Sequence, residues 1–287
     1  MKKYVNITLL LSISFILFPL PACKTTRVSP HTGFISLRNE PSSTEELFDF
    51  PPDIPPSQTG NVWDVSSVDV SAIDKSKKLI AFTFDDSPAR ELESILSVFT
   101  AYNEANPDCP ASATLFCNGN LMSDTTFPTL HALLTLRWEL ANHTYSHPDL
   151  TTLSDEDIKA EIAKTEEKLS KIDGKTQHLF RPPFGRIGKT SAKSLTVPVI
   201  NWSIDTLDWT GVSAEEIYQT VFTQKESGAI VLMHDGYPNT VEALKKLLPD
   251  LKNAGYQVTS VSQMAKVHNC PLKYGSTYIR ARKKGAD

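Results

Sequence analysis

Two adjacent carboxylates stand where an apolar run ends, in the stretch AFTFDDSPAR of residues 81–90. Asp85 and Asp86 would repel each other, and the next basic residue along the chain is Arg90. A solvated turn would explain the pair, because Asp, Ser and Pro are all turn residues. A cation or a shared proton between the two carboxylates would explain it as well.

A pair of histidines favours a cation as the explanation of the two adjacent aspartates. His143 and His147 lie four residues apart in NHTYSH, after another apolar run. Two imidazoles and one carboxylate can bind one cation and leave other coordination positions open, as in a catalytic zinc site. Such a metal lowers the pKa of bound water to about 7 and polarises a substrate oxygen. One aspartate of the pair would then bind the metal, and the other would accept a proton from the water.

Polar residues also follow three later apolar runs. They are Arg181 in RPPFG, Asp205, Asp208 and Trp209 in IDTLDW, and His234 and Asp235 in LMHD. Arg181 could orient the free carboxylate and keep its pKa low. His234 is suited to protonate a leaving group, with a nearby aspartate raising its basicity. Each group alone is typical of a turn or a core, but their recurrence after successive strands indicates one site.

The elements that must position these groups are short apolar runs that alternate with helical patterns. Strands are expected at 79–84, 112–117, 137–142, 178–183, 197–204, 229–234 and 256–261. Helices are expected after Ser154 and Ser213, each followed three positions later by an acidic residue, and after Thr240. This alternation predicts an α/β fold with a parallel sheet and crossover helices. About seven strands favour a β/α barrel smaller than the eight-stranded kind, with catalytic residues at the carboxyl ends of the strands.

Residues 1–22 are expected to be a signal peptide, because Lys2 and Lys3 precede a short apolar stretch. The segment LPAC resembles a bacterial lipobox and implies lipidation of Cys23, with secretion or an uncleaved anchor as the alternatives. Two acyl chains would hold the protein at a membrane of the bacterial envelope, facing the periplasm or the exterior. Residues 23–78 are rich in Pro and Ser and are expected to form a linker, and 267–287 a basic tail.

Composition limits the number of domains, the class of partner and the use of the cysteines. A chain of 287 residues, 40% of them hydrophobic, can form one large domain or two small ones. The net charge of -4 argues against nucleic acid as the main partner, because phosphate contacts need a basic surface. Beyond Cys23 the chain has Cys109, Cys117 and Cys270, two of which could pair outside the cytoplasm. Cys117 ends an apolar run and is expected in the core.

The ordered set TFDDS, HTYSH, RPPFG, DTLDW and LMH resembles the five motifs of the polysaccharide deacetylases. This family is also called carbohydrate esterase family four, or the NodB-homology domain. The resemblance covers roughly residues 79–264 and implies a single catalytic domain, assigned to 79–266, with the fold of a distorted (β/α)7 barrel. One position departs from the pattern, because Ser87 stands where the first motif usually has Gly. Pro88 should keep Ser87 extended, so a change at the groove edge is expected rather than a change in chemistry.

The resemblance also implies a role for each motif residue. Asp85 would be the base, and Asp86, His143 and His147 would bind the metal. Arg181 would position the base, and the N–H of Phe184 would bind the oxyanion. His234 would be the acid, tuned by Asp208, and Trp209 and Leu232 would line the pocket for the acetyl methyl group.

The expected activity is metal-dependent removal of N-acetyl groups from a polysaccharide, above all from the N-acetylglucosamine residues of peptidoglycan. Zinc is the expected ion, with cobalt, nickel or manganese as alternatives. An O-acetyl esterase acting on xylan or another acetylated polymer is one alternative, because the same groups cleave esters. A non-catalytic glycan-binding lipoprotein is another, but it predicts loss of the base, the ligands or the acid, and all of these residues are present.

Overall fold

The structure is a computed structural model that describes residues 61–282. The expected signal peptide, Cys23 and most of the expected linker lie outside the described residues. Among the described residues, none of the helices combines the length and the apolar character that crossing a membrane requires.

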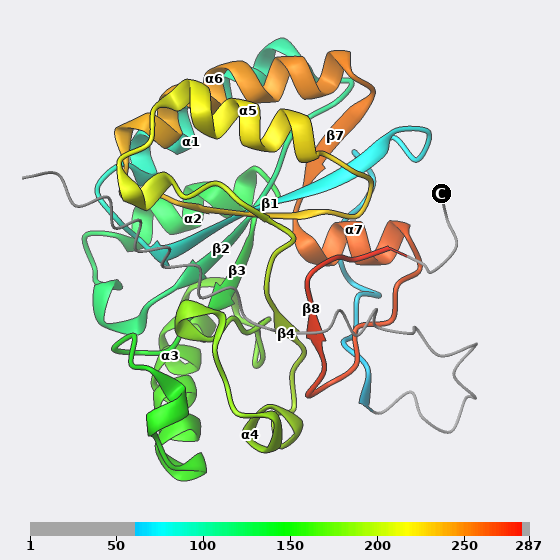
Figure 1. Cartoon of the computed structure of the whole chain (residues 1–287). Helices are drawn as coiled ribbons and strands as arrows, with labels where there is room; N and C mark the ends of the chain where they lie inside the picture. Colours follow the sequence, from blue (N-terminus) through cyan, green and yellow to red (C-terminus); the bar gives the residue numbers. More distant parts are fainter. Residues whose placement is uncertain (1–60, 283–287) are drawn as a thin grey trace, which may run out of the picture. The chain divides into compact units, whose positions relative to one another are not determined.

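A six-stranded parallel sheet is the centre of the fold (Figure 1). Its strands are β1 (Lys78–Ser87), β2 (Thr114–Cys117), β3 (Glu139–Asn142), β5 (Ile204–Asp205), β6 (Ile230–His234) and β7 (Tyr256–Thr259). They are arranged in the order β3-β2-β1-β6-β5, and β7 pairs with the first residues of β1. The longest strand, β1, is buried on both faces from Leu79 to Asp85, which explains its nearly continuous apolar sequence.

Side chains alternate between the two faces of β1. Ile80, Phe82 and Phe84 pack in one apolar cluster with residues of the outer helices, whereas Leu79 and Ala81 pack in another cluster on the opposite face. Asp85 follows Leu79 and Ala81 in this alternation. The strand therefore directs the expected base to the face opposite the layer of α1, α5 and α6.

The ring of strands continues beyond β3. Phe180 bridges Asn142 of β3 and Val199 of β4 (Val199–Ile200), and β4 pairs in parallel with β8 (Thr277–Tyr278). Among the described residues no hydrogen-bonded ladder joins β4 to β5. The expected parallel α/β architecture is confirmed, and the expected strand at 178–183 is reduced to the bridge at Phe180.

Seven α-helices connect the strands in the described part of the chain. They are α1 (Leu92–Ala105), α2 (Phe127–Thr135), α3 (Asp155–Asp173), α4 (Lys189–Lys193), α5 (Ala214–Gln224), α6 (Pro238–Asn253) and α7 (Val261–Val267). Ser154 caps α3 and Ser213 caps α5, as their sequence patterns predict. Helix α6 begins at Pro238, two residues before the expected Thr240, because proline suits the first helical position.

The folded unit extends beyond residues 79–266 on both sides. The Trp63 N–H donates to the Leu272 carbonyl at 2.8 Å, and its indole N–H donates to the Ser262 hydroxyl at 3.0 Å. Leu272 and Tyr278 are buried in the same cluster as Leu79. This packing could not be predicted from the local sequence, because single buried residues between polar ones produce neither a helical nor a strand period.

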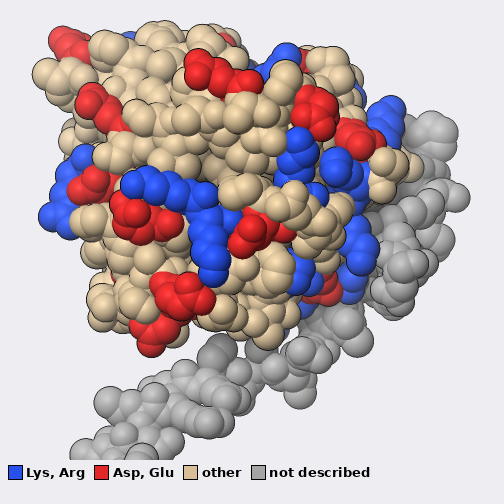
Figure 2. Space-filling model, turned by 90° about the horizontal axis from the view of Figure 1, so that it is seen from above, with Lys and Arg blue, Asp and Glu red and all other residues tan. Residues whose placement is uncertain are grey.

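The basic residues near the end of the described chain are paired. Arg280 forms an ion pair with Glu226, and Arg282 lies 3.4 Å from the same carboxylate. On the face over α5 and α6, acidic and basic side chains are interspersed with a broad uncharged area (Figure 2). This face therefore offers no extended surface of a single charge.

The three described cysteines, Cys109, Cys117 and Cys270, are free thiols and all are buried. Cys117 lies in the core as expected, on β2.

Tyr278 provides a test of the extended core. Its ring is 6% exposed, and its hydroxyl accepts the Lys273 N–H at 2.7 Å and donates to the Pro271 carbonyl at 3.2 Å. Tyr278→Ala should lower the free energy of unfolding by about 3 kcal/mol, because it leaves a large cavity. Tyr278→Phe, the control, should cost about 1 kcal/mol, because only the hydroxyl is lost. Urea unfolding would measure both, and an alanine variant within 0.5 kcal/mol of the unaltered chain would contradict the packing.

Candidate metal and acid–base site

Strand register brings the expected base and acid side by side. Asp85 of β1 and His234 of β6 are paired across the two strands. Parallel strands end at the same edge of a sheet, so the loops that carry the other motif residues leave from this edge too. The carboxylate and the imidazole therefore meet although 149 positions separate them in the sequence.

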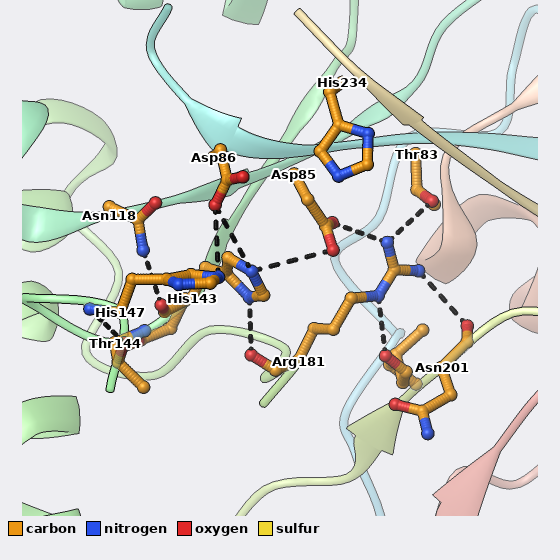
Figure 3. A network of polar contacts seen from close by, with 12 residues as sticks. Thr83, Asp85, Asp86, Asn118, His143, Thr144, His147, Arg181, Asn201 and His234 are labelled. Carbon is orange, nitrogen blue, oxygen red and sulfur yellow. Dashed lines mark hydrogen bonds and ion pairs between the residues drawn. The ribbon is translucent and has the colours of Figure 1, made fainter. Parts of the chain in front are cut away.

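Asp85 is held by a buried arginine (Figure 3). Arg181 is fully buried, and its Nη1 donates to Asp85 Oδ1 at 2.6 Å and to Thr83 Oγ1 at 2.9 Å. Its other nitrogens donate to the carbonyls of Ile200 and Asn201 at 2.8 and 3.1 Å. The guanidinium is thus fixed from several sides, which leaves Asp85 Oδ2 as the oxygen that faces away from it.

Three possible metal ligands converge next to this pair. Asp86, His143 and His147 each place one ligand atom so that all three lie within 4.8 Å of one another. His147 Nε2 lies 3.3 Å and His143 Nε2 lies 3.8 Å from Asp86 Oδ1. Two imidazole nitrogens and one carboxylate oxygen suit zinc and related divalent ions. Among the described residues no other group of three such side chains meets in this way.

The protonation of His143 fits metal binding. Its Nδ1 lies 2.8 Å from the Arg181 carbonyl, which can only accept, so Nδ1 carries the hydrogen and Nε2 is free. Burial lowers the pKa of His143, although the Asp85 and Asp86 carboxylates oppose the effect. The neutral imidazole is the form that binds a metal.

The loop of the two histidines is not helical. Thr144 and His147 have left-handed backbone conformations, with φ of 68° and 58°, and so has Asp86, with φ of 59°. Side chains hold the loop in place: Asn142 Oδ1 accepts the Thr144 N–H at 2.9 Å, and Thr144 Oγ1 accepts the His147 N–H at 3.1 Å. Strained conformations persist only where the surroundings fix them, and they often mark functional sites.

His234 is paired with Asp208. Its Nδ1 lies 2.7 Å from Asp208 Oδ1, and its backbone N–H donates to Oδ2 of the same carboxylate at 2.8 Å. Asp208 is fully buried and also accepts the Thr240 hydroxyl at 2.6 Å. Burial alone would lower the pKa of His234, but the hydrogen bond and the charge of Asp208 outweigh it and raise the pKa to about 9. The imidazole is therefore protonated at neutral pH.

The other aspartates near these motifs have different surroundings. Asp235 is buried, accepts the Ala89 N–H at 2.9 Å, and burial raises its pKa to about 7. It ties the end of β6 to the loop after β1. Burial also raises the pKa of Asp205, which accepts the Leu207 N–H at 3.0 Å. Of these three aspartates, Asp205, Asp208 and Asp235, only Asp208 bonds to the His234 ring.

The residues expected to line the substrate pocket differ in exposure and in contacts. Phe184 is 58% exposed, has a left-handed φ of 58°, and packs its ring edge-on against His147 with centroids 4.7 Å apart. Trp209, next to Asp208, is 54% exposed. Leu232 is buried on β6, two residues before His234. Ser87 is buried, and the left-handed residue of its turn is Asp86.

Several positioning residues escaped the sequence reading. Thr83 holds Arg181, Asn118 Nδ2 donates to the His143 carbonyl at 2.7 Å, and Asn142 and Thr144 hold the histidine loop. Thr83, Asn142 and Thr144 lie within or next to the motifs, whereas Asn118 follows the expected strand at 112–117 and belongs to none of them.

Several known proteins are similar to this chain in sequence and in fold. The family model for polysaccharide deacetylases matches residues 72–199. A peptidoglycan-N-acetylglucosamine deacetylase of Bacillus cereus is 32% identical over 197 residues, which cover 66% of this chain and 69% of the relative. The peptidoglycan-N-acetylglucosamine deacetylase PgdA of Listeria monocytogenes is 31% identical over 218 residues, 75% of this chain but 44% of the relative. The chain thus spans less than half the length of the Listeria protein.

Among solved structures, a family 4 acetyl xylan esterase from Clostridium thermocellum, in complex with a cobalt ion, matches with a TM-score of 0.65 and 27% identity. The match covers 71% of this chain and 98% of the esterase. With five ordered motifs and a relative more than 30% identical, this chain belongs to the polysaccharide deacetylase family.

Proposed function

We propose that this protein removes N-acetyl groups from the N-acetylglucosamine residues of peptidoglycan. The observation that carries the proposal is that the Asp85–His234 pair lies beside the group formed by Asp86, His143 and His147. The similarity to peptidoglycan deacetylases of two bacteria supports the choice of polymer.

Asp86, His143 and His147 would hold one divalent cation, with zinc as the first choice and cobalt, nickel or manganese as alternatives. Their donor atoms, one oxygen and two nitrogens, fit such an ion. A cation held there would make water more acidic and would polarise the oxygen of the acetamide.

Asp85 would accept the proton of the attacking water. Arg181 holds one carboxylate oxygen at 2.6 Å, so the other, Oδ2, is directed to the side of His143, 3.6 Å from its Nε2. Arg181 would thereby fix the direction in which the base takes the proton. The N–H of Phe184 would donate to the negative oxygen that develops on the acetyl carbon, and Trp209 and Leu232 would enclose the methyl group.

His234 would give a proton to the leaving amine. Its Nδ1 is occupied by Asp208, so the proton would come from Nε2. Asp208 would stabilise the imidazolium before transfer and keep the ring in one orientation. Base and acid thus sit on neighbouring strands, on two sides of the bond that breaks.

An O-acetyl esterase is the second candidate, because the acetyl xylan esterase of known structure is similar to this chain. The same base and acid would cleave an ester. Acetate release from acetylated xylan, compared with release from an N-acetylglucosamine oligomer and from peptidoglycan, separates the two activities.

We also propose export to the bacterial envelope, with Cys23 lipidated and the protein anchored at a membrane. This part of the proposal rests on the sequence of the first 23 residues and on the peptidoglycan polymer proposed as substrate.

Asp85→Asn tests the base. The amide cannot accept the proton, so kcat for acetate release from an N-acetylglucosamine oligomer should fall about 10³-fold. The metal content of the purified variant should match that of the unaltered chain, because Asp85 is not one of the three proposed ligands. Asp86→Asn is the contrasting variant and should lose both metal and activity. Full turnover by Asp85→Asn would refute the assignment.

Asp208→Asn tests the acid through its pH dependence. His234 must be protonated to act, so activity should fall as pH rises through its pKa of about 9. Without the Asp208 charge, burial dominates and lowers the pKa, so the alkaline limb of kcat/KM should move to lower pH by about 1 unit or more. Asp205→Asn, which removes a charge not bonded to the ring, should move the limb less. An unchanged limb in Asp208→Asn would argue against His234 as the acid.

A further inference from the structure

Helix α3 binds the backbone of the histidine loop between its two metal-binding residues. Glu161 of α3 accepts three hydrogen bonds from this loop: from the Tyr145 N–H at 3.0 Å, the Ser146 N–H at 2.8 Å and the Ser146 hydroxyl at 3.0 Å. A carboxylate that collects two successive backbone N–H groups fixes the path of the chain between them.

This path decides where the two imidazoles point. Tyr145 and Ser146 lie between Thr144 and His147, the two left-handed residues of the loop. Such conformations are unfavourable for residues other than glycine and persist only when contacts hold them. Glu161 binds the segment between the two strained residues, and therefore acts where the loop would otherwise relax.

A second set of hydrogen bonds joins α3 to the start of the loop. Asn142 Nδ2 donates to Glu166 Oε1 at 2.6 Å and to the Ile162 carbonyl at 3.0 Å. These bonds direct the amide so that Oδ1 faces the Thr144 N–H, which it accepts at 2.9 Å. Glu166 thus sets the orientation of the side chain that holds the first left-handed residue.

A buried histidine holds the Glu166 carboxylate of this second set. His178 is 1% exposed and lies between two carboxylates, with Nδ1 2.7 Å from Glu166 Oε2 and Nε2 3.1 Å from Asp173 Oδ1. Both ring nitrogens donate, so the ring is a cation that balances part of the acidic charge. Burial alone would lower its pKa, but the two carboxylates raise the pKa to about 9. The His178 ring therefore holds the Glu166 carboxylate in place as an acceptor for Asn142.

We propose that Glu161 is a positioning residue for the metal-binding loop, supported by the Glu166–His178 pair, so that helix α3 sets the affinity of the site for a divalent cation. The proposal rests on the metal site of the proposed function. It goes beyond that function, because none of these residues contacts the ligand atoms.

Zinc affinity of the full chain, stripped of metal, tests the proposal. The probe is Zn²⁺ alone, in competition with a chromogenic chelator. Glu161→Ala should raise the Kd about 10- to 100-fold, the range for residues that orient metal ligands. Glu161→Gln keeps one oxygen for the two N–H groups. Its Kd should therefore lie between that of the unaltered chain and that of Glu161→Ala. Glu167→Ala is the matched control, because Glu167 lies on the same helix and its carboxylate bonds to Lys171, at 2.8 Å, rather than to the histidine loop.

A Kd that follows this order, with Glu167→Ala equal to the unaltered chain, supports the proposal. Glu161→Ala with a lower melting temperature but a Kd within twofold of the unaltered chain overturns it, because Glu161 would then only stabilise the fold. If the alanine variant does not fold, Glu161→Gln decides: a Kd raised threefold or more supports the proposal, and an unchanged Kd overturns it. If the unaltered chain bound none of Zn²⁺, Co²⁺, Ni²⁺ and Mn²⁺, the proposed function itself would be refuted, and the inference with it.

Discussion

The buried contact between Arg181 and Asp85 is the constraint on which the rest of the site depends. A fully buried guanidinium is tolerated only when it is paired and its donors are bonded, and every bond described here meets that need. The same residue accepts the His143 ring N–H through its backbone carbonyl. Arg181 therefore joins the acid–base pair to the proposed metal ligands, and loss of its side chain would leave a buried carboxylate uncompensated.

The two halves of the site are built in different ways. Asp85 and His234 lie on paired strands, whose register fixes their separation. The histidines lie on a loop, and side chains from β3, from the loop after β2 and from α3 hold its backbone. A sheet needs no further support for its geometry, whereas a strained loop does. This difference explains why so many polar contacts gather around residues 142–147.

Most of the elements could be predicted from the sequence, because buried parallel strands read as apolar runs and capped helices carry local signals. The family could be identified too, since its motifs are short and ordered. Residues 61–77 and 267–282 gave no comparable signal, although Trp63 and Tyr278 pack on the core. The Trp63 indole contacts a residue 199 positions away, and nothing in the local pattern records such a partner.

The sequence by itself determined which residue types stand at the ends of the strands: two aspartates, two histidines four apart, an arginine and a final histidine. Only the tertiary structure decided the distances and contacts between them. The family motifs had named Asp208 as the partner of His234, but the structure alone shows its bonds to the ring and the backbone of His234 and brings Glu161 against the histidine loop. The physical reason is that residue spacing fixes which side chains share a strand or a turn, whereas strand register and helix packing fix which distant side chains meet.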